Sequence, residues 1–100
     1  MSFSERQKGI VAEGEVRKLL EQAGWTVRGL EGLGDQLAFS PAGTLLHVEV
    51  KRQERLQLPI WLRQAAAEAP AEAVPLVAFR QNRSRWYGVA PLDALLELLR

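Results

Sequence analysis

The sequence predicts a mixed α/β fold in which one β-sheet is flanked by helices. Two observations carry this prediction. Apolar residues recur at helical spacing near both ends of the chain, and short alternating or continuous apolar runs, separated by glycine and proline, fill most of the middle. A length of 100 residues suits one domain, so we expect residues 1–100 to form a single domain with one core.

The expected elements follow the order α-β-β-β-α-β-β-α. Helices are expected over residues 9–23, 58–69 and 91–99, and strands over residues 25–30, 35–40, 44–52, 74–80 and 86–89. Gly24 should end the first helix, and Pro41-Ala42-Gly43 should turn two strands into a hairpin after a glycine-rich loop at 29–34. The first and last helices carry apolar stripes that should pack on the sheet: Ala12, Val16, Leu19, Leu20 and Ala23, and Leu92, Leu95, Leu96 and Leu99.

The composition excludes several classes of function. The chain has no cysteine, which rules out disulfides, thiolate zinc sites, iron–sulfur clusters and a cysteine nucleophile. The polar start, MSFSERQKG, is unlike a secretory leader, and no apolar run approaches the ~20 residues of a membrane helix. We therefore expect a soluble, cytoplasmic protein with no membrane partner, acting in the host cytoplasm if its source is viral.

The charge is balanced overall but not along the chain. Lys and Arg number 13 against 12 Asp and Glu, for a formal net charge of +1. Between Lys51 and Arg85, basic residues outnumber acidic ones, and most are arginine, whose planar guanidinium binds phosphate in a bidentate manner. A phosphate-binding surface and an ordinary mixed surface both fit this pattern.

A charged cluster is expected where two strands meet. Alternation along the strand at 44–52 places His47, Glu49 and Lys51 on one face. A structural ion pair alone would explain the Glu49–Lys51 spacing. The predicted hairpin, however, would bring Asp35, which opens the preceding strand, close to Glu49. Neighbouring carboxylates repel each other, and a divalent cation with oxygen ligands would resolve that conflict.

These residues resemble a known family. The positions that carry the resemblance are Lys8-Gly9, Glu13, Leu19-Leu20, Gly24-Trp25, Asp35 and Val48-Glu49-Val50-Lys51. Together they resemble the PD-(D/E)xK nuclease superfamily, and within it the archaeal-type (Hjc-like) Holliday junction resolvases found in archaea and some phages. The resemblance covers the first half of the chain, whereas the second half matches mainly in element order. It implies a restriction-endonuclease-like fold, although Gly34 stands before Asp35 where the superfamily's name has proline.

The resemblance implies a catalytic set of Glu13, Asp35, Glu49 and Lys51. Asp35, Glu49 and the backbone carbonyl of Val50 would hold Mg²⁺, for which Mn²⁺ can substitute. Glu13 would bind a second ion or fix a water in the shell of the first. Lys51 would orient the nucleophile and stabilise developing negative charge.

Several other residues have open interpretations. Periodicity does not choose between Glu13 and Glu15, but the position after Lys8-Gly9 favours Glu13 and leaves Glu15 as a surface charge. His47 could act as a base or ligand, but a hydrogen-bonded structural histidine is favoured. Trp61 is expected to pack in the core. Contacts with DNA phosphates are expected from Lys8, Arg28, Arg52, Arg55, Arg63 and Gln64.

The expected function is that of a metal-dependent, structure-selective DNA endonuclease that resolves four-way (Holliday) junctions by paired phosphodiester hydrolysis. Because such a junction has approximate two-fold symmetry, a homodimer would place two active sites for two matched cuts. Its interface would involve the last helix or the Arg80–Val89 hairpin. Two alternatives stay open: another nuclease of the superfamily acting on flaps, ends or duplex DNA, and a non-catalytic DNA-binding module.

Overall fold

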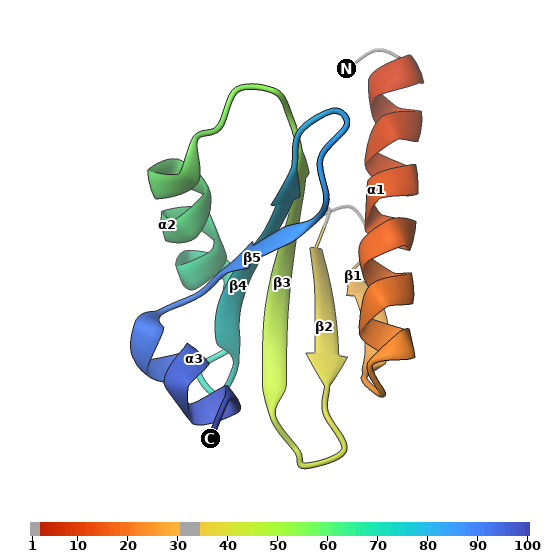
Figure 1. The fold of residues 1–100 in the computed structure, drawn as a ribbon. Coiled ribbons are helices and arrows are strands. Elements are labelled where there is room, and N and C mark those ends of the chain that lie inside the picture. Colours follow the sequence, from red (N-terminus) through yellow and green to blue (C-terminus); the bar gives the residue numbers. More distant parts are fainter. Residues whose placement is uncertain (1–2, 31–34) are drawn as a thin grey trace.

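The computed structural model describes residues 3–30 and 35–100, and its element order is the predicted α-β-β-β-α-β-β-α (Figure 1). Residues 31–34, which belong to the predicted glycine-rich loop, lie outside the described part of the chain. The three helices are α1 (Phe3–Gln22), α2 (Leu58–Glu68) and α3 (Leu92–Leu98). The strands are β1 (Thr26–Leu30), β2 (Asp35–Phe39), β3 (Leu45–Arg52), β4 (Val74–Arg80) and β5 (Tyr87–Val89).

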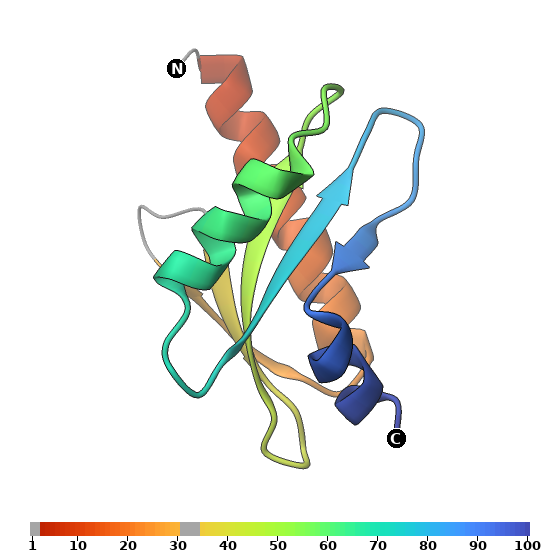
Figure 2. The same ribbon diagram turned by 90° about the vertical axis from the view of Figure 1, so that its left-hand side faces the viewer.

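The strands form one mixed sheet in the order β1-β2-β3-β4-β5. The pair β3–β4 is parallel and the other neighbouring pairs are antiparallel. A parallel pair needs a crossover connection, and α2 provides it. Helices α1 and α2 cover opposite faces of the sheet (Figures 1 and 2). The central strand β3 is therefore covered on both sides.

Each covered face has its own apolar core. On the α1 face, buried side chains from the helix and from four strands pack together: Val16, Val27, Ala38, Leu46, Val48 and Ala78. On the α2 face, Trp61 and Ala65 of the helix pack on Val77, with Phe79 beside them. The predicted core position of Trp61 is confirmed, since its side chain is buried.

The hairpin between β2 and β3 forms as predicted. Its turn is closed by Ser40, whose backbone N–H donates to the Thr44 carbonyl at 2.9 Å. Gly43 adopts a φ of 91°, which side-chain-bearing residues rarely reach. The register that follows places Asp35 directly opposite Glu49.

The first helix is longer at its start than predicted, beginning at Phe3 instead of residue 9. No proline interrupts residues 3–9, so the helix can extend through this polar segment. Its end is as predicted. Gly24 has a φ of 94°, and the N–H groups of Gly24 and Trp25 donate to the carbonyls of Glu21 and Leu20, both at 3.0 Å. This is a Schellman cap.

Parts of the two predicted apolar stripes do not face the sheet. On α1, Ala12, Val16 and Leu20, spaced by four residues, pack inward, whereas Leu19 is exposed and lines a shallow open pocket with Trp86. On α3, the predicted stripe is largely exposed, at 70% for Leu92, 60% for Leu96 and 82% for Leu99. This helix has about two turns and follows an edge strand. Among its described leucines, Leu98 is the one that packs against the core on the α1 face.

Among the described helices, none is long and apolar enough to cross a bilayer.

Candidate functional site

Two buried carboxylates face each other at one end of the sheet. Asp35 opens β2 and Glu49 lies near the end of β3, and the two residues are direct cross-strand partners. Each is only 2% exposed. The prediction that the hairpin would bring Asp35 close to Glu49 is therefore confirmed. Glu49 also pairs with Val77, which packs against α2, so this site lies on the α2 face of the sheet.

Lys51 lies between the buried Glu49 and solvent. Its Nζ is 3.5 Å from Glu49 Oε1, and a fifth of its side chain is exposed. The ammonium group can therefore contact the carboxylate and a solvent-borne group at the same time.

Glu13 approaches the same acids from α1. Its backbone carbonyl accepts a 2.7 Å hydrogen bond from Gln36 Nε2, which fixes the helix to β2 beside Asp35. Burial raises the pKa of the Glu13 carboxyl, and the nearby charge of Asp35 raises it further. The structure thus brings Glu13 into electrostatic contact with Asp35, from the opposite side of the sheet to α2.

Burial and repulsion also act on Glu49. Burial is the largest cause raising the pKa of Glu49 to about 7; Lys51 opposes the rise, and the charges of Glu68 and Asp35 add to it. Glu49 Oε2 and both carboxylate oxygens of Asp35 are buried without a hydrogen-bond partner among the described residues. Orphaned buried carboxylate oxygens are costly unless a cation satisfies them. This donor set fits a divalent metal ion, which favours carboxylate oxygens.

His47 belongs to the same cluster, but not in the hydrogen-bonded role that was expected. It is 1% exposed, and its Nε2 lies 2.6 Å from Asp35 Oδ2. This distance is that of an ion pair, although Asp35 Oδ2 receives no aligned hydrogen bond and His47 Nδ1 has no hydrogen-bond partner among the described residues. The imidazole is therefore held against Asp35 without satisfying it.

Sequence reasoning missed Glu68, the last residue of α2. Ligand atoms of Asp35, His47 and Glu68 all lie within 4.8 Å of one another. Among the described residues, this is the group of three possible metal ligands that lie so close together. Gln64 Nε2 donates to Glu68 Oε1 at 3.4 Å. The helical spacing could have pointed to it, because Glu68 lies one turn beyond Gln64, on the face of α2 that also carries the buried Trp61.

The residues expected to contact DNA come from α1, β1, β3, α2 and the connection between β3 and α2. Those without a hydrogen bond or ion pair in the described chain are exposed: Lys8, Arg28, Arg55 and Arg63. Arg52, at the end of β3, donates to Asn82 Oδ1 at 3.1 Å. Gln64 is half-buried beside Glu68.

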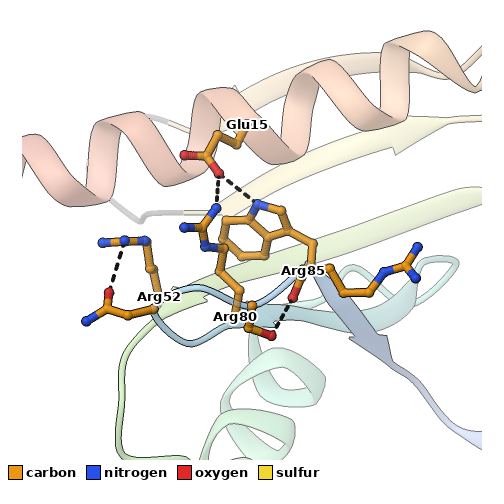
Figure 3. A network of polar contacts seen from close by, with 7 residues as sticks. Glu15, Arg52, Arg80 and Arg85 are labelled. Carbon is orange, nitrogen blue, oxygen red and sulfur yellow. Dashed lines mark hydrogen bonds and ion pairs between the residues drawn. The ribbon is translucent and has the colours of Figure 1, made fainter.

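Glu15 is not the free surface charge that was expected. Its Oε1 accepts hydrogen bonds from Arg80 Nη1 at 2.8 Å and Trp86 Nε1 at 2.9 Å (Figure 3). The Arg80 guanidinium carbon also lies 5.8 Å from the centre of the Trp86 ring. Glu15 therefore ties α1 to the β4–β5 hairpin, whereas Glu13 faces the Asp35 cluster. The structure separates the two glutamates that periodicity could not.

Comparison with solved structures finds a similar fold. The chain aligns with the 1.6 Å structure of Hjc from Archaeoglobus fulgidus, a Holliday junction resolvase from an archaeal hyperthermophile. The TM-score is 0.62 at 23% sequence identity, and the alignment covers 83% of this chain and 72% of the other. No protein-family model and no curated protein matches the chain. The chain has the same fold as this Hjc structure, and the resemblance seen in the sequence is confirmed at the level of the fold.

Proposed function

We propose that this protein is a metal-dependent DNA endonuclease that resolves four-way junctions by paired phosphodiester hydrolysis. The observation that carries the proposal is the buried Asp35–Glu49 pair with Lys51 beside it, on an Hjc-type fold. The substrate class comes from the structural neighbour, which is described as a Holliday junction resolvase. A DNA substrate of this kind implies an intracellular location.

Asp35, Glu49 and the backbone carbonyl of Val50 are the residues that would hold Mg²⁺, with Mn²⁺ able to substitute. A bound divalent ion would supply an activated water and neutralise charge on the scissile phosphate. Glu13 would bind a second ion or fix a water in the shell of the first. Burial is the main cause of the raised pKa of Glu13, and the nearby charge of Asp35, which adds to it, supports this role.

Lys51 would stabilise the negative charge that develops on the scissile phosphate. Its ammonium group is held near Glu49 at 3.5 Å and is partly open to solvent. A phosphate at this position would receive a hydrogen bond from Nζ, and the developing negative charge would be stabilised by a donor that is already oriented. By resemblance, the products carry 5′-phosphate and 3′-hydroxyl ends.

DNA would be bound mainly through its backbone. Lys8, Arg28, Arg52, Arg55, Arg63 and Gln64 are the proposed contacts. Arginine and lysine contacts to phosphate carry no sequence information, so recognition would depend on the shape of the junction and would weaken strongly with salt. Two matched cuts require two active sites, which a homodimer supplies.

The proposal is tested by cleavage of a labelled synthetic four-way junction, with flap and linear duplex controls, in Mg²⁺ or EDTA. Glu49→Gln and Lys51→Ala should each lower the cleavage rate at least about 100-fold, and EDTA should abolish cleavage. Glu72→Gln, a change at an exposed carboxylate outside the cluster, should leave the rate unchanged.

The substrate panel separates the alternatives. Cleavage of flaps or plain duplex, with the same dependence on metal and on Glu49, would replace the substrate but keep the metal site. Binding of the junction with no cleavage of any substrate would overturn the enzyme proposal and indicate a DNA-binding module.

A further inference from the structure

We propose that Asp35, His47 and Glu68 form a binding position for a first-row transition metal ion, which shares Asp35 with the Asp35–Glu49 site. The inference concerns the same site as the proposed function and deepens it, but its ligand set is different. It draws on a histidine and on a glutamate of α2, neither of which is part of the proposed Glu13, Asp35, Glu49 and Lys51 set.

The first argument is the state of His47. A buried histidine normally has both ring nitrogens paired, with one donating and one accepting. Here Nδ1 has no partner among the described residues, and Nε2 lies 2.6 Å from an Asp35 oxygen that is itself unpartnered. The ring is 1% exposed, so bulk water cannot satisfy it. A metal ion bound by Nε2 and Asp35 would replace the proton that otherwise bridges this contact, and Nδ1 would then carry the N–H of the neutral ring.

The second argument is the convergence of three elements on one point. Asp35 comes from β2, His47 from β3 and Glu68 from the last turn of α2. Their ligand atoms lie within 4.8 Å of one another. Ligands bound to one ion at about 2.0–2.2 Å are about 3–4 Å apart, so Asp35 and His47, now 2.6 Å apart, would separate slightly and Glu68 would move inward around an ion. Glu68 is exposed and has the freedom to make that movement.

The position of Glu68 is itself supported. Trp61 and Ala65 anchor α2 on the sheet, and Glu68 lies one turn after Ala65 on a helix whose rotation they fix. Gln64 donates to Glu68 Oε1 at 3.4 Å, a long hydrogen bond that orients the carboxylate without fixing it. The charge of Glu68 is also felt at Glu49, as the raised pKa of Glu49 records. An exposed glutamate without such restraints would be an ordinary surface charge.

The ligand chemistry selects the kind of ion. Carboxylates and water alone suit Mg²⁺, whereas an imidazole ligand suits first-row transition ions. An Asp–His–Glu position should therefore prefer Mn²⁺ and later transition ions over Mg²⁺. The expected difference is an increase in Mn²⁺ affinity relative to Mg²⁺ that disappears when His47 is replaced.

The test exploits the single histidine of the sequence. Electron spin-echo envelope modulation of Mn²⁺ bound to the full-length, untagged protein detects nitrogen bonded to the metal. We expect a ¹⁴N imidazole coupling that changes to the ¹⁵N pattern when only histidine is ¹⁵N-labelled. This readout needs no mutation and no cleavage assay.

Two variants extend the test. His47→Gln should remove the coupling and lower Mn²⁺ affinity at least about tenfold. Glu68→Gln should also weaken Mn²⁺ binding, whereas Glu72→Gln, four residues further on and outside the cluster, should not. If His47→Gln fails to fold, the isotope-labelled wild type still decides the question.

The outcomes distinguish this inference from the proposed function. Tight Mn²⁺ binding without an imidazole coupling would overturn the Asp–His–Glu position. If, in that case, the wild type still cleaves the junction and Glu49→Gln does not, the proposed nuclease function stands. A wild-type protein that binds no Mn²⁺ would overturn both.

Discussion

At the scale of single residues, the cluster around Asp35 is stabilised poorly by the protein itself. Buried carboxylate oxygens of Asp35 and Glu49 have no hydrogen-bond partner among the described residues. The cationic groups near them are His47, when protonated, at 2.6 Å from Asp35, and Lys51 at 3.5 Å from Glu49. Burying like charges without compensation costs folding free energy. Such an arrangement is typical of a site that is completed by a cation, and it has a measurable consequence in the metal-free protein.

That consequence is a fall in stability with rising pH. Glu49 ionises at its ordinary value of 4.5 when unfolded and at about 7 when folded. Between these values the folded state binds more protons than the unfolded state, so the free energy of unfolding falls as pH rises and levels off above the folded pKa. We expect a loss of roughly 1–3 kcal/mol across the window from this group. The raised pKa of Glu13 adds to the loss in the same direction.

Urea unfolding in EDTA between about pH 5 and 8 measures this slope. Glu49→Gln removes the titrating group, so its slope should be shallower than that of the wild type and its stability at the alkaline end higher. Glu72→Gln should keep the wild-type slope. A Glu49→Gln protein with the full wild-type slope would show that Glu49 does not carry the effect.

At the scale of elements, a C-terminal cap and a pair of hydrogen bonds from Glu15 position α1 against the sheet. The Schellman cap at Gly24 turns the chain from α1 into β1. Glu15 then joins the middle of α1 to Arg80 and Trp86 on the far edge of the sheet. Because Glu13 is two residues from Glu15 on the same helix, the hydrogen bonds of Glu15 also help to position Glu13, which approaches Asp35.

The cap is tested by a matched pair of glycine substitutions. Gly24→Ala forces a side chain into a φ of 94° and should destabilise the protein by about 1 kcal/mol. Gly14→Ala lies within α1, where an added Cβ meets nothing within 4 Å, and should stabilise it by about 0.5–1 kcal/mol. Chemical denaturation measures both. Equal effects of the same sign would contradict the assigned backbone conformations.

The Glu15 link is tested in the same way. Glu15→Ala leaves the Trp86 indole N–H and the Arg80 guanidinium without their acceptor and should cost about 1–3 kcal/mol. Glu21→Ala removes an exposed 3.5 Å ion pair with Arg17 and should cost at most about 0.5 kcal/mol. If the two variants lose the same stability, the link contributes no more than a surface ion pair.

At the scale of the whole molecule, the topology brings the cluster together. The hairpin places Asp35 beside Glu49, and the α2 crossover to the parallel strand β4 carries Glu68 over the same face. On the other face, α1 brings Glu13 to the same end of the sheet. The apolar surface of α3 is left exposed, with Leu92, Leu96 and Leu99 open. A homodimer, required by the proposed paired cleavage, would cover such a surface.

The dimer prediction is specific to this helix. Leu96→Glu places a charge in the exposed stripe of α3 and should convert a dimer into a monomer in sedimentation velocity. Mn²⁺ binding should persist, because α3 contributes no residue to the cluster. Ile60→Glu, at an exposed apolar position on α2, should stay dimeric. A Leu96→Glu protein that stays dimeric would exclude the last helix and leave the Arg80–Val89 hairpin.

The elements and the Asp35–Glu49 pair could be predicted because both depend on local signals. Alternation fixes which strand residues share a face, and the turn at Pro41–Gly43 fixes the register between neighbouring strands. The role of Glu68 could not be predicted in this way. Its place in the cluster depends on how Trp61 and Ala65 rotate α2 against the sheet, which is a property of packing and not of spacing.

Long-range partners were equally hidden in the sequence. Glu15 meets Arg80 and Trp86 across separations of 65 and 71 residues, so its periodicity on α1 carried no information about them. The exposure of α3 was missed because an amphipathic stripe shows which residues share a face, but not whether another element is present to cover it.

The most direct test of the central claim uses a supercoiled plasmid that extrudes a cruciform. Paired hydrolysis within one complex should give linear plasmid, with little nicked circle, and the ends should be ligatable, as 5′-phosphate ends are. Formation of the linear product should need a divalent metal and should be lost in Glu49→Gln. Accumulation of nicked circles, cutting of a plasmid without the cruciform, or linear product in EDTA would contradict a metal-dependent, paired resolution of four-way junctions.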